Sequence, residues 1–355
     1  MKILITGACG FVGSTLAREL LRAREGLTVF GVDNFSRPGS ESNRRALADL
    51  GVRVGHADLR NAADLDGLPD CDWVIDAAAN PSVLAGVDGR ASSRQLMEHN
   101  LWGTINTLEY CKARRAGLVL LSTSRVYSIA PLANLPVEVR DRAFVPRLDA
   151  ALPAGVTAAG VSESFPTTPP VSLYGSSKVA SEAVALEYGE TFGFPVWINR
   201  CGVLAGAGQF GKPDQGIFSF WINAHLRRRP LKFIGFGGNG YQVRDALHPR
   251  DLIPVLLRQM AGDNSGAQRV QNLSGGVDNS MSLAQLHAWC DNRFGAHAIS
   301  GDLEPRPFDI PWMVLDSGLA QRQWNWRPQT RLPEILEEIA RHAERNPEWL
   351  KLSEA

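Results

Sequence analysis

The sequence has no surplus of charge of either sign. Its 355 residues include 37 Lys and Arg and 37 Asp and Glu, so the formal net charge is zero at pH 7. Proteins that bind nucleic acid usually carry a basic surplus, and proteins held on anionic membranes carry a basic tract. We therefore expect neither a nucleic-acid partner nor a membrane partner.

Long apolar runs and a cysteine framework are also lacking. No apolar stretch reaches the roughly 18 residues of a membrane-spanning helix, and the first residues resemble a strand rather than a secretory leader. The five cysteines are widely spaced, odd in number and without a Cys-x-x-Cys pair, which is typical of reduced thiols. These features predict a soluble, cytoplasmic protein.

The motifs of two common enzyme classes are missing. The seven histidines show none of the spacings of zinc sites, so we expect no metal. There is no G-x-S-x-G elbow, so a serine hydrolase is not supported. His248 is a candidate substrate contact, with a satisfied core or loop histidine as the alternative. The run Arg227–Arg229 is interpreted as a helix cap, with a phosphate site as the alternative.

Short apolar runs alternate with longer helical patterns through the first half of the chain. This rhythm predicts an α/β fold with a doubly wound, parallel, Rossmann-type sheet. The runs typical of buried strands are residues 2–6, 27–33, 52–56, 72–76, 117–122 and 195–200, and the helical patterns lie at 11–24, 93–115 and 173–192.

The pattern changes near residue 201. We expect a nucleotide-binding domain over residues 1–201 and a smaller mixed α/β substrate lobe over 202–355, partly interleaved with the first, with helices at 249–261, 282–293 and 331–345. Residues 129–170 carry seven of the 21 prolines and little periodicity, which predicts a long loop. Such loops often bind ligands or act as lids, and a surface excursion without function is the alternative.

A glycine-rich turn follows the first predicted strand and opens the first helix. Gly7, Gly10 and Gly13 are spaced G-x-x-G-x-x-G, which lets backbone N–H groups approach a pyrophosphate at the helix N-terminus. Asp33 ends the second strand 20 residues after Gly13, where a carboxylate binds ribose hydroxyls and repels a 2′-phosphate. The glycine-rich turn and Asp33 together predict NAD as the cofactor, rather than NADP.

Tyr174 and Lys178 begin a later helical pattern. At spacing i, i+4 they lie on one helix face, and a cation beside a phenol lowers the pKa of the phenol. Tyr174 is then a candidate base for a hydroxyl proton. Thr123, at the end of an apolar run, is placed to hydrogen-bond the reacting oxygen, because ligands of open α/β sheets bind at the strand ends.

With these residues, the chain resembles the extended short-chain dehydrogenase/reductase family over nearly its whole length. Asp58-Leu59-Arg60, Ala77-Ala78-Ala79 and the N-x-x-G-T stretch from Asn100 to Thr104 match motifs of that family. The resemblance implies that Thr123, Tyr174 and Lys178 are catalytic. It implies that the cofactor is bound by Gly7, Gly10, Phe11, Val12, Gly13, Asp33, Asn34, Asp58, Leu59, Ala77, Ala78, Ala79, Asn100, Ser122, Tyr174 and Lys178.

Within the family, the chain resembles the nucleotide-sugar epimerases. The resemblance implies a nucleotide-diphosphate sugar as substrate, inversion at C2 of a CDP-sugar through a transient keto intermediate, and a homodimer paired through residues 93–115 and 173–192. It implies that the substrate is bound by Ser124, Arg125, Gln209, Gln215, Arg244, His248 and Arg306. Dehydratases of the family carry Asp-Glu after the catalytic Thr, whereas this chain has Ser124-Arg125.

Two alternatives stay open at this point. One is a 4-epimerase or a dehydrogenase of a UDP- or GDP-sugar, which would use the same three catalytic residues. The other is a non-catalytic, NAD-binding regulatory protein, against which the complete Thr/Tyr/Lys set argues.

Overall fold

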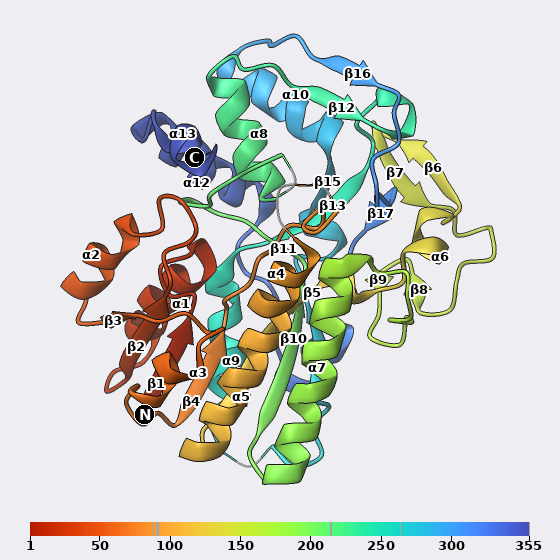
Figure 1. The fold of residues 1–355 in the computed structure, drawn as a ribbon. Coiled ribbons are helices and arrows are strands. Elements are labelled where there is room, and N and C mark those ends of the chain that lie inside the picture. Colours follow the sequence, from red (N-terminus) through yellow and green to blue (C-terminus); the bar gives the residue numbers. More distant parts are fainter. Residues whose placement is uncertain (88, 90–91, 214, 263, 355) are drawn as a thin grey trace.

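The computed structural model describes residues 1–87, 89, 92–213, 215–262 and 264–354. Its centre is a seven-stranded parallel sheet in the order β14-β10-β5-β4-β1-β2-β3 (Figure 1). The strands are β1 (Lys2–Thr6), β2 (Thr28–Asp33), β3 (Arg53–His56), β4 (Trp73–Asp76), β5 (Gly117–Thr123), β10 (Val196–Cys201) and β14 (Val270–Leu273). The predicted α/β fold and parallel sheet are confirmed.

Helices cover both faces of this sheet, which is why its strands are almost continuously apolar. One face packs on α1 (Phe11–Ala23), α9 (Ile253–Gln259) and α11 (Gly318–Trp324), and the other on α3 (Ala62–Asp66), α5 (Gly103–Arg114) and α7 (Ser172–Phe192). Successive residues of β1 serve opposite faces: Ile3 and Ile5 join the first core cluster, and Leu4 joins the second. The short helices α2 (Ser42–Asp49) and α4 (Ser93–Met97) complete the two helical layers.

The strand order places a crevice at one edge of the sheet. The chain runs from β1 outward through β2 to β3, and then crosses to β4 on the other side of β1. Such a switch point leaves a crevice at the carboxyl ends of the two central strands, where ligands bind in open α/β sheets. Gly7 follows β1 and Ala77 follows β4, so both predicted cofactor segments meet at this crevice.

The second lobe is built from the C-terminal half and lies beside the carboxyl ends of the strands (Figure 1). Its helices are α8 (Ile217–Leu226), α10 (Leu283–Phe294), α12 (Leu332–Arg345) and α13 (Trp349–Glu354). Its strands are β11 (Val203–Leu204), β13 (Val243–Leu247), β15 (Ser280–Ser282) and β17 (Trp312–Met313) in one sheet, and β12 (Lys232–Ile234) with β16 (Ser300–Asp302) in another. Because β14, α9 and α11 return to the central sheet, the two halves of the chain interleave.

The arginines after α8 hold the ends of neighbouring helices. Arg227 donates to the carbonyls of Ala343 and Asn346 at the end of α12, at 2.7 and 3.0 Å. Arg228 donates to Phe294 and Gly295 at the end of α10, at 2.8 and 3.0 Å. Their donors satisfy carbonyls that a helix end leaves without partners, so these residues act as caps.

Residues 129–170 form a folded subdomain rather than the predicted loop. They contain α6 (Ile129–Ala133) and two hairpins, β6 (Val137–Arg140) with β7 (Ala143–Pro146) and β8 (Val156–Thr157) with β9 (Gly160–Val161). Val161 N donates to Val314 O at 2.8 Å, and the apolar side chains pack against β13 and β17. The sequence prediction failed because hairpins this short have too few residues to show a period.

Among the helices of the described ranges, none combines the length and the apolar character that a membrane span needs.

Candidate active site

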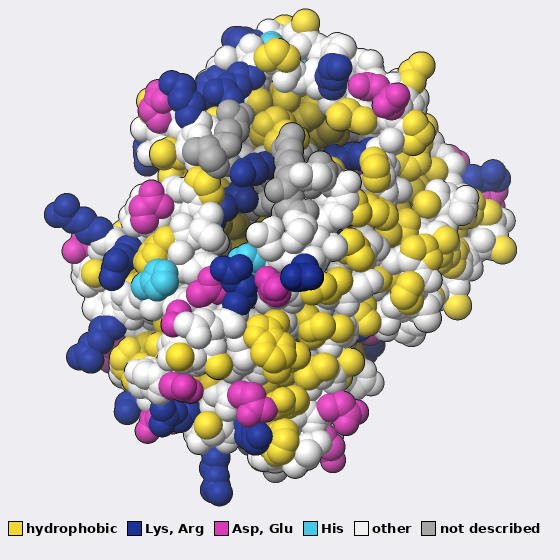
Figure 2. Space-filling model, viewed as in Figure 1, with side chains coloured by type: hydrophobic (Ala, Val, Ile, Leu, Met, Phe, Trp, Pro, Cys, Tyr) yellow, Lys and Arg dark blue, Asp and Glu magenta, His cyan; other side chains and the backbone are white. Residues whose placement is uncertain are grey.

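A cavity of about 1000 Å³ lies between the sheet and the second lobe. Figure 2 shows a hollow there, with Lys and Arg side chains beside a hydrophobic wall. Most of the predicted site residues line it: Gly7, Gly10, Phe11, Val12, Gly13, Asp33, Asn34, Asp58, Leu59, Ala77, Ala78, Ala79, Ser122, Thr123, Ser124, Arg125, Tyr174, Gln209, Gln215, Arg244 and Arg306. Asn100, Lys178 and His248 are not among the described lining residues, and neither is any residue of 129–170.

The glycine turn brings backbone to the floor of the cavity. Gly7 has φ +62°, and a Cβ on Gly13 would lie 2.2 Å from the carbonyl oxygen of Gly7. Only glycine permits so close an approach of turn and helix. Gly10 caps α1 without a side-chain hydrogen bond, which leaves the amides of the first turn facing the cavity. This arrangement fits a pyrophosphate at the helix N-terminus.

Asp33 ties the glycine turn to the end of β2. Its Oδ2 accepts from Cys9 N at 2.9 Å and its Oδ1 accepts from Phe35 N at 2.8 Å, yet each oxygen keeps a free lone pair. The carboxylate lines the cavity one strand away from the turn. A ribose diol beside it would be bound, and a 2′-phosphate would be repelled. The turn and Asp33 together fit a dinucleotide of the NAD type.

Asp58 is held by an arginine that the sequence reasoning did not assign. Arg60 donates from Nε and Nη2 to the two oxygens of Asp58, at 2.9 and 2.6 Å. These hydrogen bonds hold the pKa of Asp58 well below its usual range. Asn34 adds a third donor at 3.3 Å. The D-L-R spacing contained this signal, because residues i and i+2 of a turn can pair side chains.

Buried polar residues under the cavity order the ends of β1 and β4. Thr6 Oγ1 donates to Asp76 at 2.6 Å and accepts from the amides of Ala77 and Ala78 at 3.2 Å. Thr104 also donates to Asp76, at 3.4 Å. Asp76 therefore has a clear role: it shapes the alanine segment that follows β4.

Asn100 supports the site from below instead of lining it. It lies in a π-helical turn, η1 (Glu98–Trp102), between α4 and α5. Its amide accepts from Asn80 N at 2.8 Å, and donates to Asn80 O at 3.2 Å and to Ser177 at 3.1 Å. Both polar atoms of the Asn100 side chain hydrogen-bond within the protein, and the cofactor contact stays a prediction. Asn100 joins the loop after β4 to the helix of Tyr174.

Tyr174 and Thr123 meet at the cavity. Thr123, at the end of β5, and Tyr174, near the start of α7, both line it. Burial raises the pKa of the Tyr174 phenol, while the hydrogen bond to Thr123 and the charge of Arg125 lower it. The sequence predicts that Lys178 lowers the pKa of this phenol, and that role of Lys178 stays a prediction. Arg125, two residues after Thr123, is a second positive charge that acts on Tyr174.

Lys178 is buried behind Tyr174, one turn further along α7. Burial lowers the pKa of its ammonium, and the carboxylates of Asp76 and Glu182 raise it. Glu182 is itself bound by Arg200 at 2.6 Å and accepts from Ser122. Glu182 and Arg200 were not predicted. They form a buried ion pair that fixes the strand end carrying Ser122 and Thr123.

Three arginines also line the cavity. Arg244 pairs with Asp309 at 2.9 Å, Arg125 donates to Phe308 O at 3.2 Å, and Arg306 donates to Pro213 O at 3.1 Å. Burial, with the charge of Arg244, lowers the pKa of Arg125 to about 10. Three guanidinium groups with a single paired carboxylate leave local positive charge, as a bound diphosphate requires.

Of the two glutamines in the cavity wall, Gln215 is bonded to the loop after β2. Gln215 accepts from Arg37 at 2.8 Å, and Arg37 also donates to Phe210 O, across 178 and 173 residues of sequence. Gln209 donates to Leu204 O at 2.7 Å. Arg37 lies four residues after Asp33, so its side chain links the loop that follows Asp33 to the substrate lobe.

His248 is buried with partners on both ring nitrogens. Its Nδ1 accepts from Arg250 N at 3.1 Å and its Nε2 lies 3.3 Å from Glu338. The ring is buried against Gly206, where a Cβ would lie 2.7 Å from Nε2. These contacts favour the alternative interpretation, a satisfied histidine, and the substrate contact stays a prediction.

Comparison with known proteins gives a consistent picture. Residues 3–273 match the model of the NAD dependent epimerase/dehydratase family. The chain is 28% identical to CDP-paratose 2-epimerase of Salmonella typhi over 339 residues, 93% of this chain and 95% of that protein. It is 25% identical to UDP-glucuronate 4-epimerase 3 of Arabidopsis thaliana over 359 residues, 96% of this chain and 76% of that protein.

A solved structure agrees over almost the whole chain. The UDP-glucuronic acid 4-epimerase of Bacillus cereus, in complex with UDP-glucuronic acid and NAD, superposes with a TM-score of 0.78 at 25% identity. The match covers 97% of this chain and 99% of that one.

Proposed function

The chain belongs to the NAD-dependent epimerase/dehydratase family, and we propose that it epimerises a nucleotide-diphosphate sugar through a transient keto intermediate. The observation that carries this proposal is that Thr123 and Tyr174 line one cavity together with the glycine turn and three arginines. The arrangement provides one base, one hydrogen-bonding hydroxyl and two separate sites for phosphates.

The residues that would hold NAD are the glycine turn, Asp33, Asp58 and the alanine segment at 77–79. When bound, NAD supplies an acceptor that takes a hydride from the sugar carbon and returns it. In this proposal Tyr174 takes the hydroxyl proton and later gives it back, while Thr123 hydrogen-bonds the reacting oxygen. Lys178, one turn behind Tyr174 on the same face of α7, would add its positive charge beside the nicotinamide ribose.

An epimerase is favoured over a dehydratase by the residues beside Thr123. A dehydratase must expel a hydroxyl group, which needs a carboxylic acid near the sugar. The chain has Ser124 and Arg125 at those positions, and both line the cavity. Three described acidic residues line the cavity: Asp309 is paired with Arg244, Asp58 with Arg60, and Asp33 belongs to the proposed cofactor site, where it accepts from two backbone amides.

The sugar proposed is a CDP-sugar inverted at C2. Its support is the similarity to CDP-paratose 2-epimerase over 93% of the chain. Inversion at C4 of a UDP-sugar is the second candidate, and the UDP-glucuronate 4-epimerases support it at 25% identity. The same Thr/Tyr/Lys set serves either carbon, so the choice depends on how the lobe orients the sugar.

A panel of substrates in heavy water tests the proposal. The purified protein is incubated separately with CDP-, UDP- and GDP-sugars, and the products are analysed by NMR and mass spectrometry. We expect product epimers without accumulation of NADH and without deuterium at the inverted carbon, because the hydride returns internally. Net NADH would indicate a dehydrogenase, and deuterium at that carbon an enolisation. No turnover and no binding across the panel would favour the regulatory alternative.

A homodimer paired through α5 and α7 is part of the same proposal. Two large apolar side chains on this side of the molecule are exposed, Trp102 at 51% and Phe192 at 45%. Paired helices would cover such groups. Size-exclusion chromatography with light scattering should give twice the chain mass of 38.7 kDa, and the monomer mass would contradict this part.

A further inference from the structure

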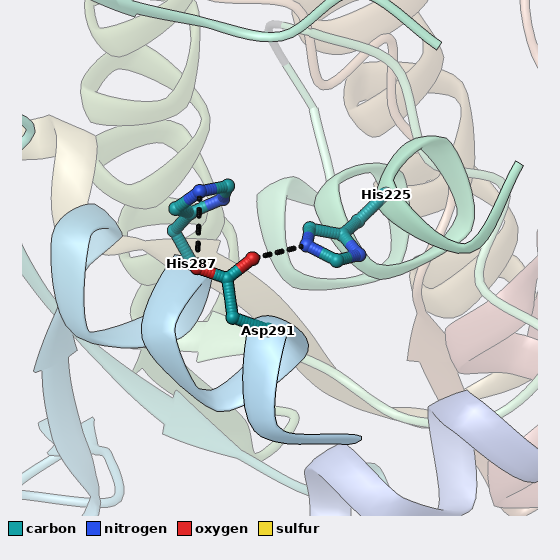
Figure 3. A group of neighbouring side chains, drawn as sticks. All are labelled: His225, His287 and Asp291. Carbon is teal, nitrogen blue, oxygen red and sulfur yellow. Dashed lines mark hydrogen bonds and ion pairs between the residues drawn. The ribbon is translucent and has the colours of Figure 1, made fainter. Parts of the chain in front are cut away.

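A second polar cluster lies outside the cavity, between α8 and α10 (Figure 3). His225 comes from α8, and His287 and Asp291 come from one face of α10 at spacing i, i+4. The Nε2 of His225 lies 2.9 Å from one oxygen of Asp291, and the Nε2 of His287 lies 3.6 Å from the other. One ligand atom of each residue lies within 4.8 Å of the other two.

The cluster is unusual for the core that surrounds it. The side chain of His225 is fully buried and that of His287 is 10% exposed, among apolar residues such as Phe218, Ile222 and Leu286. The Nδ1 atoms of both histidines are buried without a partner among the described residues. Because no described neighbour fixes Nδ1, each ring can carry its proton there. The lone pair is then on Nε2, the atom that faces Asp291.

We propose that His225, His287 and Asp291 form a binding site for a divalent transition metal, with zinc as the preferred ion. Two imidazole nitrogens and one carboxylate oxygen are a ligand set typical of Zn²⁺, with water in the fourth position. Tetrahedral ligands at Zn–N distances near 2.0 Å are about 3.3 Å apart. The two Nε2 atoms lie 2.9 and 3.6 Å from different oxygens of Asp291, and the three ligand atoms all lie within 4.8 Å of one another, so the side chains need only small shifts to reach that spacing.

The chemistry of the three side chains suits a cation. Each neutral imidazole offers one nitrogen lone pair, and an ionised carboxylate offers only acceptor oxygens. The backbone amide of His297 donates to Asp291 at 3.0 Å and helps to hold the carboxylate in place. The side chain of Asp291 is 34% exposed, which gives an ion a route to the site.

The position of the site indicates a structural role. None of the three residues lines the cavity. The ring of His287 lies 6.1 Å from that of Trp221 and 5.8 Å from that of Phe233, and these two rings stack at 5.5 Å. Trp221 and Phe233 belong to the apolar part of the lobe, and Trp221 lines the cavity. A bound ion would fasten α8 to α10 behind that wall.

The test uses the full chain without a polyhistidine tag, freed of metal by a chelator. Co²⁺ is added as a spectroscopic probe and Zn²⁺ as a competitor. We expect one equivalent of Co²⁺ with the intense visible absorption of a tetrahedral ion, its displacement by Zn²⁺, and a higher unfolding temperature with Zn²⁺. Weak, octahedral binding, or no change in the unfolding temperature, would overturn the proposal.

Variants separate this site from surface histidines. Asp291→Asn and His287→Gln keep the size of each side chain and should weaken Co²⁺ binding about tenfold or more. His56→Gln removes an exposed histidine and should leave binding unchanged. Asp291→Asn is informative even where His287→Gln fails to fold, because Asp291 is partly exposed. Equal Co²⁺ affinity in Asp291→Asn and in the unaltered chain would overturn the assignment. Epimerisation is measured separately and should not need the metal.

Discussion

The guanidinium of Arg244 lies 2.9 Å from the carboxylate of Asp309 in the wall of the cavity. Arg244 also donates to the carbonyls of Val243 and Ile310, at 2.7 and 3.0 Å. These contacts fix the plane of the guanidinium beside Arg125 and Arg306. A planar donor held in this way can bind two oxygens of a phosphate together, which a flexible ammonium cannot.

Replacing Arg244 by Lys should therefore weaken substrate binding more than turnover. The charge remains, but the paired donors and the contact with Asp309 are lost. We expect KM for the nucleotide sugar to rise about tenfold, equivalent to about 1.4 kcal/mol, with little change in kcat. Steady-state kinetics measures both. Arg341→Lys, at an exposed ion pair, is the matched control and should leave both constants unchanged. An unchanged KM in Arg244→Lys would remove Arg244 from the binding site.

Replacing Tyr174 by Phe should stop turnover without disturbing the fold. The ring packs against Ala85 and Leu96, and Phe keeps that packing while losing the hydroxyl. Loss of a general base lowers kcat by about 10²–10⁴-fold. Retained NAD, measured by absorbance of the denatured protein, would show that the cofactor site survives. Tyr188→Phe, on the same helix but at a surface contact with Glu109, is the control. Near-normal activity in Tyr174→Phe would contradict the assignment.

The pH dependence of turnover should identify Arg125 as a modulator of Tyr174. Burial raises the pKa of the phenol and the charge of Arg125 lowers it. Activity that needs the phenolate rises with pH through that pKa. Removing the positive charge in Arg125→Gln should raise the pKa, so the rising limb of kcat against pH moves to higher pH. Arg306→Gln also removes a cavity charge but does not act on Tyr174. In Arg306→Gln, the rising limb of kcat against pH should stay at the same pH, whether or not KM changes. Identical limbs in Arg125→Gln and the unaltered chain would refute the coupling.

The sequence predicts the parts of this molecule that depend on local spacing. The glycine turn, Asp33 and the Tyr174–Lys178 pair are each set by a few neighbouring residues, and the structure brings them to one sheet edge. The buried strands are visible because both faces of a parallel sheet must be apolar. β14 was missed since Gln271 and Asn272, in a four-residue strand, are polar and hydrogen-bonded inside the core.

Contacts between distant segments could not be predicted in the same way. Arg37 and Gln215 are separated by 178 residues, and His225 and Asp291 by 66, so no motif joins either pair. Asn100 was recognised by its motif, but its role depends on Asn80 and Ser177, whose positions only the fold provides. Spacing indicates which residues matter locally, and packing decides which of them reach the cavity.

The glycine turn gives the most severe steric prediction. A Cβ on residue 13 would lie 2.2 Å from the carbonyl oxygen of Gly7 and 2.9 Å from Cα of Ala8, and both are backbone atoms that cannot rotate away. Gly13→Ala should therefore push the turn away from α1, destabilise the fold by about 1–3 kcal/mol and abolish tight NAD binding. Thermal unfolding and NAD titration measure the two effects. Gly67→Ala is the matched control, because a Cβ there meets nothing within 4 Å and φ is −84°. If Gly13→Ala binds NAD as tightly as Gly67→Ala does, the close approach of turn and helix is not what forms the pyrophosphate site.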